Sequence, residues 1–404
     1  MAGKNEKAKR GYLTGREIRE IAKANAKEIR RLEAYKNRKA PESEFTTEMR
    51  DPDNILEIED LHTYFFTEQG VVKAVNGVSY NVPKHSVVGV VGESGCGKSV
   101  TSMSVMRLIQ GPTGQIVDGN IRFHSKDFVR DAKGNPVLAE DGSYVMEEKV
   151  YDIAKMPIRE IHRLRGKQIS MIFQEPMTSL NPVFTIGQQL DEVTLIHIPG
   201  ATKQMAKDKT YEMLQLVGII PENVYDRFPH ELSGGMRQRV MIAMALAAQP
   251  RLIIADEPTT ALDVTIQAQI LELLQDIKNK IDGSILLITH DLGVIAEMAD
   301  YVVVMYAGKV IEKGTVMEIF QDPRHPYTIG LQKSKPTMNL DDSTQLYNIP
   351  GNVPNPINMP SHCYFKERCA KCTAKCSGEY PGMVQVSPTH FVACHLYDEE
   401  TANG

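Results

Sequence analysis

The stretch Gly92-Glu-Ser-Gly-Cys-Gly-Lys-Ser99 decides the fold of this chain. It follows an apolar, β-branched run, Ser86-Val-Val-Gly-Val-Val91, and it precedes a helical pattern over residues 100–109. A glycine-rich loop between a strand and a helix lets backbone N–H groups surround phosphate oxygens at the helix N-terminus. In that setting Lys98 reaches the β- and γ-phosphates of a nucleotide, and Ser99 ligates Mg²⁺. The predicted nucleotide contacts are Gly92, Glu93, Ser94, Gly95, Cys96, Gly97, Lys98, Ser99 and Val100.

Two carboxylates end a second hydrophobic run, Leu252-Ile-Ile-Ala-Asp256-Glu257. An acid at such a strand end is what a phosphate-loop enzyme uses to hold Mg²⁺, so we assign Asp256 to the metal. Glu257, one residue further on, is then expected to act as the general base on an attacking water. The alternative is that both carboxylates merely cap the start of a helix.

From Ile55 to about Phe320, short β-branched runs alternate with longer helical patterns. The runs are 86–91, 169–173, 252–256, 285–289 and 301–305. Continuous apolar strands separated by helices predict an α/β fold with a parallel sheet covered on both faces. The charged stretch 127–152, with turn signals at Gly134-Asn-Pro136 and Asp141-Gly142, predicts a surface hairpin inserted into the 55–320 domain.

The two ends of the chain differ from this central region. Residues 1–50 are rich in Lys and Arg, and Thr14-Gly-Arg-Glu17 matches a capping box, which predicts a helix from about Gly15 to Tyr35. We favour a solvated basic arm over a contact with anionic lipid, because its apolar stripe is narrow. After Phe320 the sequence becomes rich in proline, which predicts a separate C-terminal domain over residues 321–404.

Composition excludes several classes of protein. A net charge of −5 argues against unaided binding of nucleic acid, which demands a basic surface. No run of apolar residues is long enough to span a bilayer, and the charged N-terminus lacks the apolar core of a secretory signal. We therefore expect a cytoplasmic protein that reaches the membrane only through partners.

Five of the six cysteines fall near the C-terminal end. Four thiolates spaced like Cys363, Cys369, Cys376 and Cys394 can bind an iron–sulfur cluster or a tetrahedral zinc ion, and spacing does not choose between them. Cys372 is an additional cysteine that leaves one ligand assignment open. The alternative is a set of unliganded thiols.

Three further motifs bear a resemblance to a known family. Leu232-Ser-Gly-Gly-Met236-Arg-Gln-Arg239 resembles the signature of ATP-binding cassette (ABC) ATPases, Gln174 lies where their Q-loop falls, and His290 ends a strand as their switch histidine does. Ala261-Leu-Asp263 resembles their D-loop. The resemblance implies a helical subdomain, catalytic roles for Gln174, Glu257 and His290, and a contact of Gln174 with Mg²⁺. It also implies a head-to-tail dimer, in which Ser233, Gly234 and Gly235 grasp the γ-phosphate of ATP on the opposing subunit.

Two details of this family pattern depend on single residues. Met236 stands where the broader family usually has glutamine, but the phosphate-contacting Ser and Gly residues are intact. An aromatic residue upstream of the phosphate loop stacks on adenine in the family, and of Tyr64-Phe65-Phe66 we favour Phe65.

Two longer segments narrow the resemblance. Residues 174–182 and Arg324-His-Pro-Tyr-Thr328 resemble the D-type ATP-binding subunits of oligopeptide, dipeptide and nickel importers. The resemblance implies a paralogous second ATPase, two transmembrane permease subunits, an extracytoplasmic peptide-binding protein, and a position on the cytoplasmic face of the membrane. It favours a 4Fe-4S cluster over zinc at the four cysteines. Import of nickel or another small solute is the alternative function, followed by an ABC ATPase acting on ribosomes or DNA.

Overall fold

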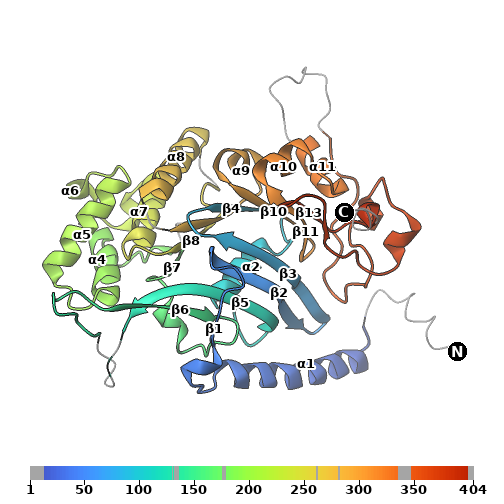
Figure 1. Ribbon diagram of the computed structural model, residues 1–404, viewed down its shortest axis with the longest axis horizontal. Helices are drawn as coiled ribbons and strands as arrows, with labels where there is room; N and C mark the ends of the chain where they lie inside the picture. The colour runs from blue at the N-terminus through green and yellow to red at the C-terminus, as the bar shows by residue number, and fades with distance from the viewer. Residues whose placement is uncertain are drawn as a thin grey trace.

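The computed structural model describes residues 13–129, 131, 136–174, 179–260, 263–280, 283–334 and 347–398. Within these residues the strands form an eight-stranded sheet of order β12-β13-β11-β10-β4-β9-β8-β7 and a five-stranded sheet of order β1-β6-β5-β2-β3. Figure 1 shows the two sheets facing one another, with α2 (Lys98–Val105) between them. One group of buried apolar side chains fills this space, and it includes Ile58, Val90, Phe123 and Ile254.

The eight-stranded sheet contains the predicted parallel strands. They are β4 (Val87–Val91), β7 (Ile169–Ile172), β8 (Leu252–Asp256), β9 (Ser284–Ile288) and β10 (Tyr301–Tyr306). Every residue of β4, β8 and β9 is buried, as their unbroken apolar runs require. Because β4, β8 and β9 are parallel neighbours, their carboxyl ends meet at one edge of the sheet. The α/β prediction is confirmed.

The five-stranded sheet is antiparallel, and the sequence patterns did not predict it. Its strands are β1 (Thr46–Thr47), β2 (Asn54–Thr67), β3 (Gly70–Pro83), β5 (Gly114–Phe128) and β6 (Met146–Asp152). The segment predicted as a hairpin insertion supplies part of it, since Phe128 pairs with Met146 and Arg122 with Asp152. Its turn at Gly134 lies outside the described residues.

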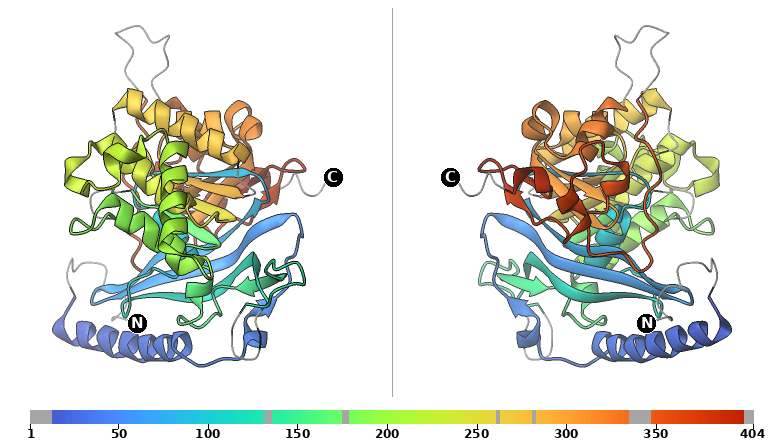
Figure 2. Two further views of the ribbon diagram at one scale, coloured as in Figure 1. Left: turned by 90° about the vertical axis from the view of Figure 1, so that its left-hand side faces the viewer. Right: turned by 90° about the vertical axis from the view of Figure 1, so that its right-hand side faces the viewer.

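Helices cover both sheets. The amino-terminal helix α1 (Gly15–Lys36) has the predicted capping box of Thr14 and Glu17, and it lies along the outer face of the antiparallel sheet in Figure 2. A group of helices gathers at one end of the molecule: α4 (Ile186–His197), α5 (Lys203–Leu216), α6 (Pro221–Val224) and α7 (Gly234–Leu246). The remaining helices are α8 (Val264–Lys280), α9 (Leu292–Met298), α10 (Val316–Gln321) and α11 (Pro326–Lys333). Among the described residues, no helix is both long enough and apolar enough to span a bilayer.

The carboxyl-terminal segment is joined to the main sheet. Strands β12 (Val384–Gln385) and β13 (Phe391–Val392) extend it beyond β11 (Lys309–Thr315), with Glu312 opposite Val392. The carboxylate of Glu312 is fully buried and accepts hydrogen bonds from the backbone N–H groups of Arg324 and His325 and lies 2.8 Å from Nε2 of His390. The segment after Phe320 therefore packs against β11 through these strands, and the domain boundary near residue 320 remains a prediction.

Candidate active site

The phosphate loop, residues 92–97, connects β4 to α2 through a backbone that requires glycine. Gly92 and Gly97 have φ angles of 153° and 102°, in the region that disfavours side chains. A Cβ atom on Gly92 would lie 2.2 Å from the carbonyl oxygen of Met305, and one on Gly97 would lie 2.4 Å from that of Ala74. Gly95, with φ 78°, faces open space instead. The loop is thus pressed against the sheet on one side and open on the other.

Lys98 lies inside the curl of this loop. Its ammonium group donates to the carbonyl oxygens of Gly92 at 2.7 Å and of Glu93 at 3.2 Å. Cys96, two residues before it, is buried, and burial raises the pKa of its thiol. Cys96 therefore contributes its backbone to the loop, while the Lys98 side chain supplies a positive charge where the motif places phosphate oxygens.

The helix that follows the loop is shorter than predicted. The pattern predicted helix over 100–109, but α2 ends at Val105 because Arg107 adopts a left-handed backbone with φ 53°. Ser99, in the first turn of α2, donates its hydroxyl to Oδ1 of Asp256 at 2.9 Å. This bond joins the phosphate loop to the end of β8.

Ser99 and Asp256 form the predicted metal-binding pair. Asp256 is only 6% exposed, and this burial raises the pKa of its carboxyl to about 6, with a further upward contribution from Glu257 and an opposing one from the Ser99 hydrogen bond. A hydroxyl and a carboxylate oxygen are the hard ligands that Mg²⁺ prefers, so the donor set fits this ion. A divalent cation there would hold Asp256 ionised.

The three predicted catalytic residues, Gln174, Glu257 and His290, lie together directly after Asp256, at the carboxylate of Glu257. Oε2 of Glu257 accepts hydrogen bonds of 2.9 Å from Nε2 of Gln174 and of 2.9 Å from the Thr260 hydroxyl, and it lies 3.4 Å from Nδ1 of His290. The Glu257 backbone has φ 48° and donates to the carbonyl oxygen of Ile288. The side chain of His290 is 63% exposed, so the cluster opens to the surface. Thr260 was not predicted, although it follows Glu257 by only three residues.

Gln174 was predicted to have a catalytic role and to contact Mg²⁺. In the structure its amide contacts Glu257 rather than Ser99 or Asp256. Residues 175–178, which follow it, lie outside the described residues. A contact of Gln174 with the metal therefore remains a prediction.

The signature segment forms the open N-terminus of α7. Ser233 is the N-cap, and its hydroxyl accepts a hydrogen bond from the backbone N–H of Met236. A Cβ atom on Gly234 would meet no atom within 4 Å, whereas one on Gly235 would lie 2.9 Å from Ile266. The first turn therefore presents unpaired N–H groups and a positive dipole end toward solvent. Gln238, further along α7, donates to the carbonyl oxygen of Pro258 at 2.6 Å and so ties this helix to the segment after Glu257.

The structure gives less information on two other predicted elements, the adenine-stacking aromatic residue and the D-loop. Phe65 on β2 is half-buried and pairs with Val72 on β3, two residues from Ala74, whose carbonyl oxygen faces Gly97. Tyr64 is instead hydrogen-bonded to Asn76, and Phe66 is buried in the core. In the D-loop segment, Ala261 and Leu262 lie outside the described residues, and Asp263 caps the start of α8 by accepting from Ile266.

The predicted metal-cluster cysteines lie near one another. All six cysteines are free, and burial raises the thiol pKa of Cys363 and of Cys394 to about 11, with a smaller contribution to Cys394 from Cys363, Cys369 and Cys376. In the part of the chain that the structure describes, however, no group of three or more His, Cys, Asp or Glu side chains is arranged to hold a metal ion. The thiols are therefore close enough for their charges to interact, and a metal cluster at them remains a prediction.

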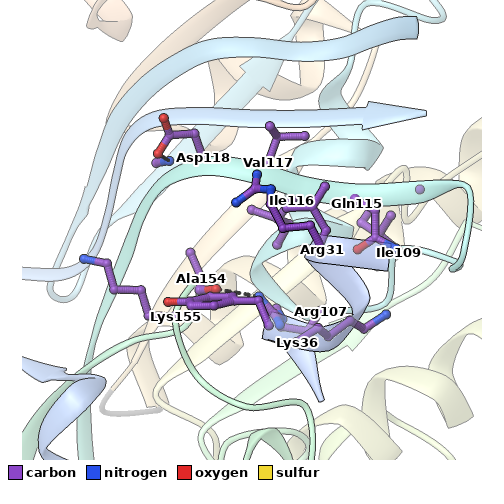
Figure 3. Close-up of a pocket in the computed structure, with 14 residues that line it drawn as sticks. Arg31, Lys36, Arg107, Ile109, Gln115, Ile116, Val117, Asp118, Ala154 and Lys155 are labelled. Atoms are coloured by element: carbon purple, nitrogen blue, oxygen red, sulfur yellow. Dashed lines mark hydrogen bonds between the residues drawn. The ribbon is translucent and has the colours of Figure 1, made fainter. Parts of the chain in front are cut away.

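A well-formed hollow lies away from these residues, between α1 and β5 (Figure 3). It encloses about 210 Å³ and is lined by Arg31, Lys36, Arg107 and Lys155 among others. Arg107 donates to the carbonyl oxygen of Ala154, and desolvation lowers its pKa to about 10. Two of the cations that line it are paired with acids, Lys36 with Glu33 and Lys155 with Asp152, and we assign the hollow no role in the chemistry.

The fold and the site together define an ABC-type ATPase. A family model described as ABC transporter matches residues 75–260, and one described as oligopeptide/dipeptide transporter, C-terminal region, matches residues 311–376. The chain belongs to the family of ATP-binding proteins of oligopeptide and dipeptide ABC transporters.

The similarity to curated relatives covers most of this chain and most of each relative. The oligopeptide transport ATP-binding protein AppD of Bacillus subtilis is 46% identical over 349 residues, which cover 86% of this chain and 98% of AppD. OppD of the same organism, also named as an oligopeptide transport ATP-binding protein, is 49% identical over 343 residues, covering 85% of this chain and 88% of OppD. Among solved structures, a dimeric ATP-binding cassette, MJ0796 bound to ADP and Pi, is similar in fold, with a TM-score of 0.52 and 21% identity over 65% of this chain and 98% of MJ0796.

Proposed function

We propose that this chain is the ATPase subunit that powers import of dipeptides and oligopeptides through an ABC transporter. The observation that carries the proposal is the meeting of Gln174 and His290 on the carboxylate of Glu257, beside the Ser99–Asp256 pair. The peptide substrate is supported by the named roles of AppD, OppD and the dipeptide transport protein DppD, to which the chain is similar over most of its length.

Each residue of the site has a distinct task in this proposal. The backbone N–H groups of residues 92–99 and the Lys98 ammonium bind the β- and γ-phosphates of ATP, while Phe65 stacks on adenine. Ser99 and Asp256, with Gln174, would hold Mg²⁺, which when bound supplies positive charge to the phosphate oxygens. Glu257 accepts a proton from the attacking water, and His290 fixes the orientation of that carboxylate.

The second half of each ATP site comes from another ATPase subunit. The exposed N-terminus of α7 offers Ser233, Gly234 and Gly235 to a nucleotide outside this chain, since the dipole and free N–H groups favour phosphate. A head-to-tail dimer with a paralogous ATPase supplies that nucleotide. Two transmembrane permeases and an extracytoplasmic peptide-binding protein complete the transporter, with this chain on the cytoplasmic face of the membrane and no nucleic-acid partner.

Uptake measurements test the function. Cells from which this chain has been deleted are expected to lose uptake of labelled di- and oligopeptides and to regain it with the wild-type chain but not with Lys98→Ala. Uptake of nickel is measured in the same cells. Unchanged peptide uptake after deletion, or loss of nickel uptake alone, would contradict the peptide assignment and support the alternative substrate.

A 4Fe-4S cluster at Cys363, Cys369, Cys376 and Cys394 is a further part of the proposal, with zinc as the second choice. Its support is the proximity of the four thiols, and it requires that their side chains reorient on binding. Iron, acid-labile sulfide and zinc are measured in anaerobically purified wild-type protein and in Cys376→Ser, with Cys372→Ser as the matched control. Absence of both metals from the wild-type protein would rule the cluster out.

A further inference from the structure

The phosphate loop contains an acid, Glu93, whose negative charge disfavours the binding of phosphates. Glu93 directly follows Gly92, at the start of the loop that binds the negatively charged phosphates of ATP. A carboxylate beside a triphosphate raises the free energy of the bound state through Coulomb repulsion, and the effect is larger where water is partly excluded. Some other group must therefore compensate this charge if ATP is to bind tightly.

The compensating group comes from residues 363–394, the cysteine-bearing segment near the carboxyl end. The guanidinium of Arg368 binds the Glu93 carboxylate with both ends, at 2.7 Å from Nη1 to Oε2 and 3.0 Å from Nη2 to Oε1. Such a two-point pair fixes direction as well as charge. The Arg368 side chain is only 5% exposed, and the pair with Glu93 raises the pKa of its guanidinium further above its ordinary value. Arg368 immediately precedes Cys369.

The remaining donors of Arg368 hold it rigidly in this position. Its Nε donates to the carbonyl oxygen of Pro350 at 2.9 Å, and its Nη1 donates to the hydroxyl of Tyr306 at 3.2 Å. These partners belong to the main sheet and to the carboxyl-terminal segment, so the guanidinium links both to the phosphate loop. A flexible surface arginine would lose more conformational entropy in making the same pair.

A second contact reaches the backbone of the same loop residue. The N–H of Glu93 donates to the hydroxyl of Tyr327 on α11 at 2.8 Å. The Tyr327 ring is fully buried, with its centroid 4.8 Å from that of Tyr306 and 5.6 Å from that of Phe365. Side chain and backbone of Glu93 are thus both fixed by residues that follow the parallel strands in sequence.

We propose that Arg368 is a positioning residue for ATP binding: it neutralises Glu93 and fixes the start of the phosphate loop, so that nucleotide affinity depends on the folded state of the cysteine-bearing segment. The inference rests on the proposed ATPase function. It makes the carboxyl-terminal segment part of the ATP site through a contact 275 residues apart in sequence. Arg368 acts through Glu93 and needs no contact with ATP itself.

Removing the two charges one at a time and together separates this role from a merely structural one. In the full-length protein, Arg368→Met is expected to raise the dissociation constant of a fluorescent ATP analogue, and the KM for ATP, by about tenfold, with a smaller change in kcat. Adding Glu93→Gln to Arg368→Met removes the uncompensated carboxylate and is expected to restore most of the affinity. Arg16→Met, which removes an exposed arginine paired with Glu20 on α1, is the matched control and should leave both constants unchanged.

Several outcomes would overturn the proposal. If Arg368→Met binds ATP as the wild type does, or if Glu93→Gln fails to restore affinity in the double variant, Arg368 does not act through the charge of Glu93. If Arg368→Met does not fold, Glu93→Gln alone carries the test: it is expected to tighten ATP binding by about threefold, and weaker or equal binding would contradict the inference. A wild-type protein that binds ATP without hydrolysing it would instead count against the proposed function.

Discussion

The hydroxyl of Ser99 donates a hydrogen bond of 2.9 Å to Oδ1 of Asp256, which joins the start of α2 to the end of β8. The bond brings the two predicted magnesium ligands together although they are 157 residues apart in sequence. It forms because β4 and β8 both pair in parallel with β9, so the segments that leave their carboxyl ends emerge at the same edge of the sheet. The topology of the sheet thus brings the two predicted magnesium ligands together.

Removing the charge of Asp256 is expected to weaken the response to magnesium. Asp256→Asn retains an oxygen that can accept from Ser99 but lacks the carboxylate, so the Mg²⁺ concentration for half-maximal ATP hydrolysis should rise by about tenfold or more. Binding of ATP in the presence of a chelator should be retained, because the variant removes a negative charge near the phosphates. A magnesium dependence equal to that of the wild type would exclude Asp256 as a ligand.

Acid is expected to loosen the carboxyl-terminal segment through His325. Burial lowers the pKa of this histidine to about 4, partly offset by Glu312, while its Nδ1 accepts a hydrogen bond from the backbone N–H of Tyr327. The unfolded chain therefore binds a proton near pH 6.5 that the folded chain resists, so stability present at pH 7 is lost as the pH falls toward 4. The loss attributable to His325 amounts to about 3 kcal/mol.

His325→Asn keeps an N-cap acceptor for α11 but does not titrate in this range. Urea unfolding at pH 7 and at pH 4.5 measures the effect. We expect the wild type to lose more of its unfolding free energy on acidification than the variant does. Equal losses in the two proteins would mean that His325 does not titrate on unfolding.

A charge at the open end of α7 should separate ATP binding from hydrolysis. Gly234 has space for a side chain, so Gly234→Asp should fold and bind ATP at its own phosphate loop. Its carboxylate would repel the phosphates of an opposing subunit's ATP, and we expect hydrolysis by the assembled ATPase pair to fall by about a hundredfold. Gly234→Ala is the matched control without charge. Full activity of Gly234→Asp would show that α7 does not face a nucleotide.

The positions of the glycine-rich loop and of the two acids in the fold could be predicted from sequence because their signals are local. Gly92 to Ser99 form a strand–loop–helix unit whose glycines are required by φ angles and by the close approach of Met305 and Ala74. The acids Asp256 and Glu257 likewise mark the end of a fully buried strand. Neighbouring residues determine such features, so they can be recognised without knowing how distant parts of the chain pack.

Other features depend on distant pairing and could not be predicted. Strands β2 and β3 are long and contain register shifts, for example between Ile58 and Leu61, which disrupt the alternation that would reveal them. The pair of Arg368 with Glu93 leaves no local pattern, since either residue alone resembles an ordinary surface charge. The spacing of the cysteines likewise could not predict how their side chains are arranged, because spacing does not determine the loop conformation.

Hydrolysis of ATP by Glu257→Gln, measured beside the wild type in the presence of Mg²⁺ and the partner ATPase, tests the central claim most directly. The wild type should turn over ATP, whereas Glu257→Gln should bind ATP, lose about a hundredfold or more of the rate, and accumulate as an ATP-bound dimer in size-exclusion chromatography. Glu222→Gln, at an exposed acid on α6, serves as the control and should behave as the wild type. Unchanged hydrolysis by Glu257→Gln would contradict the assignment of Glu257 as the base.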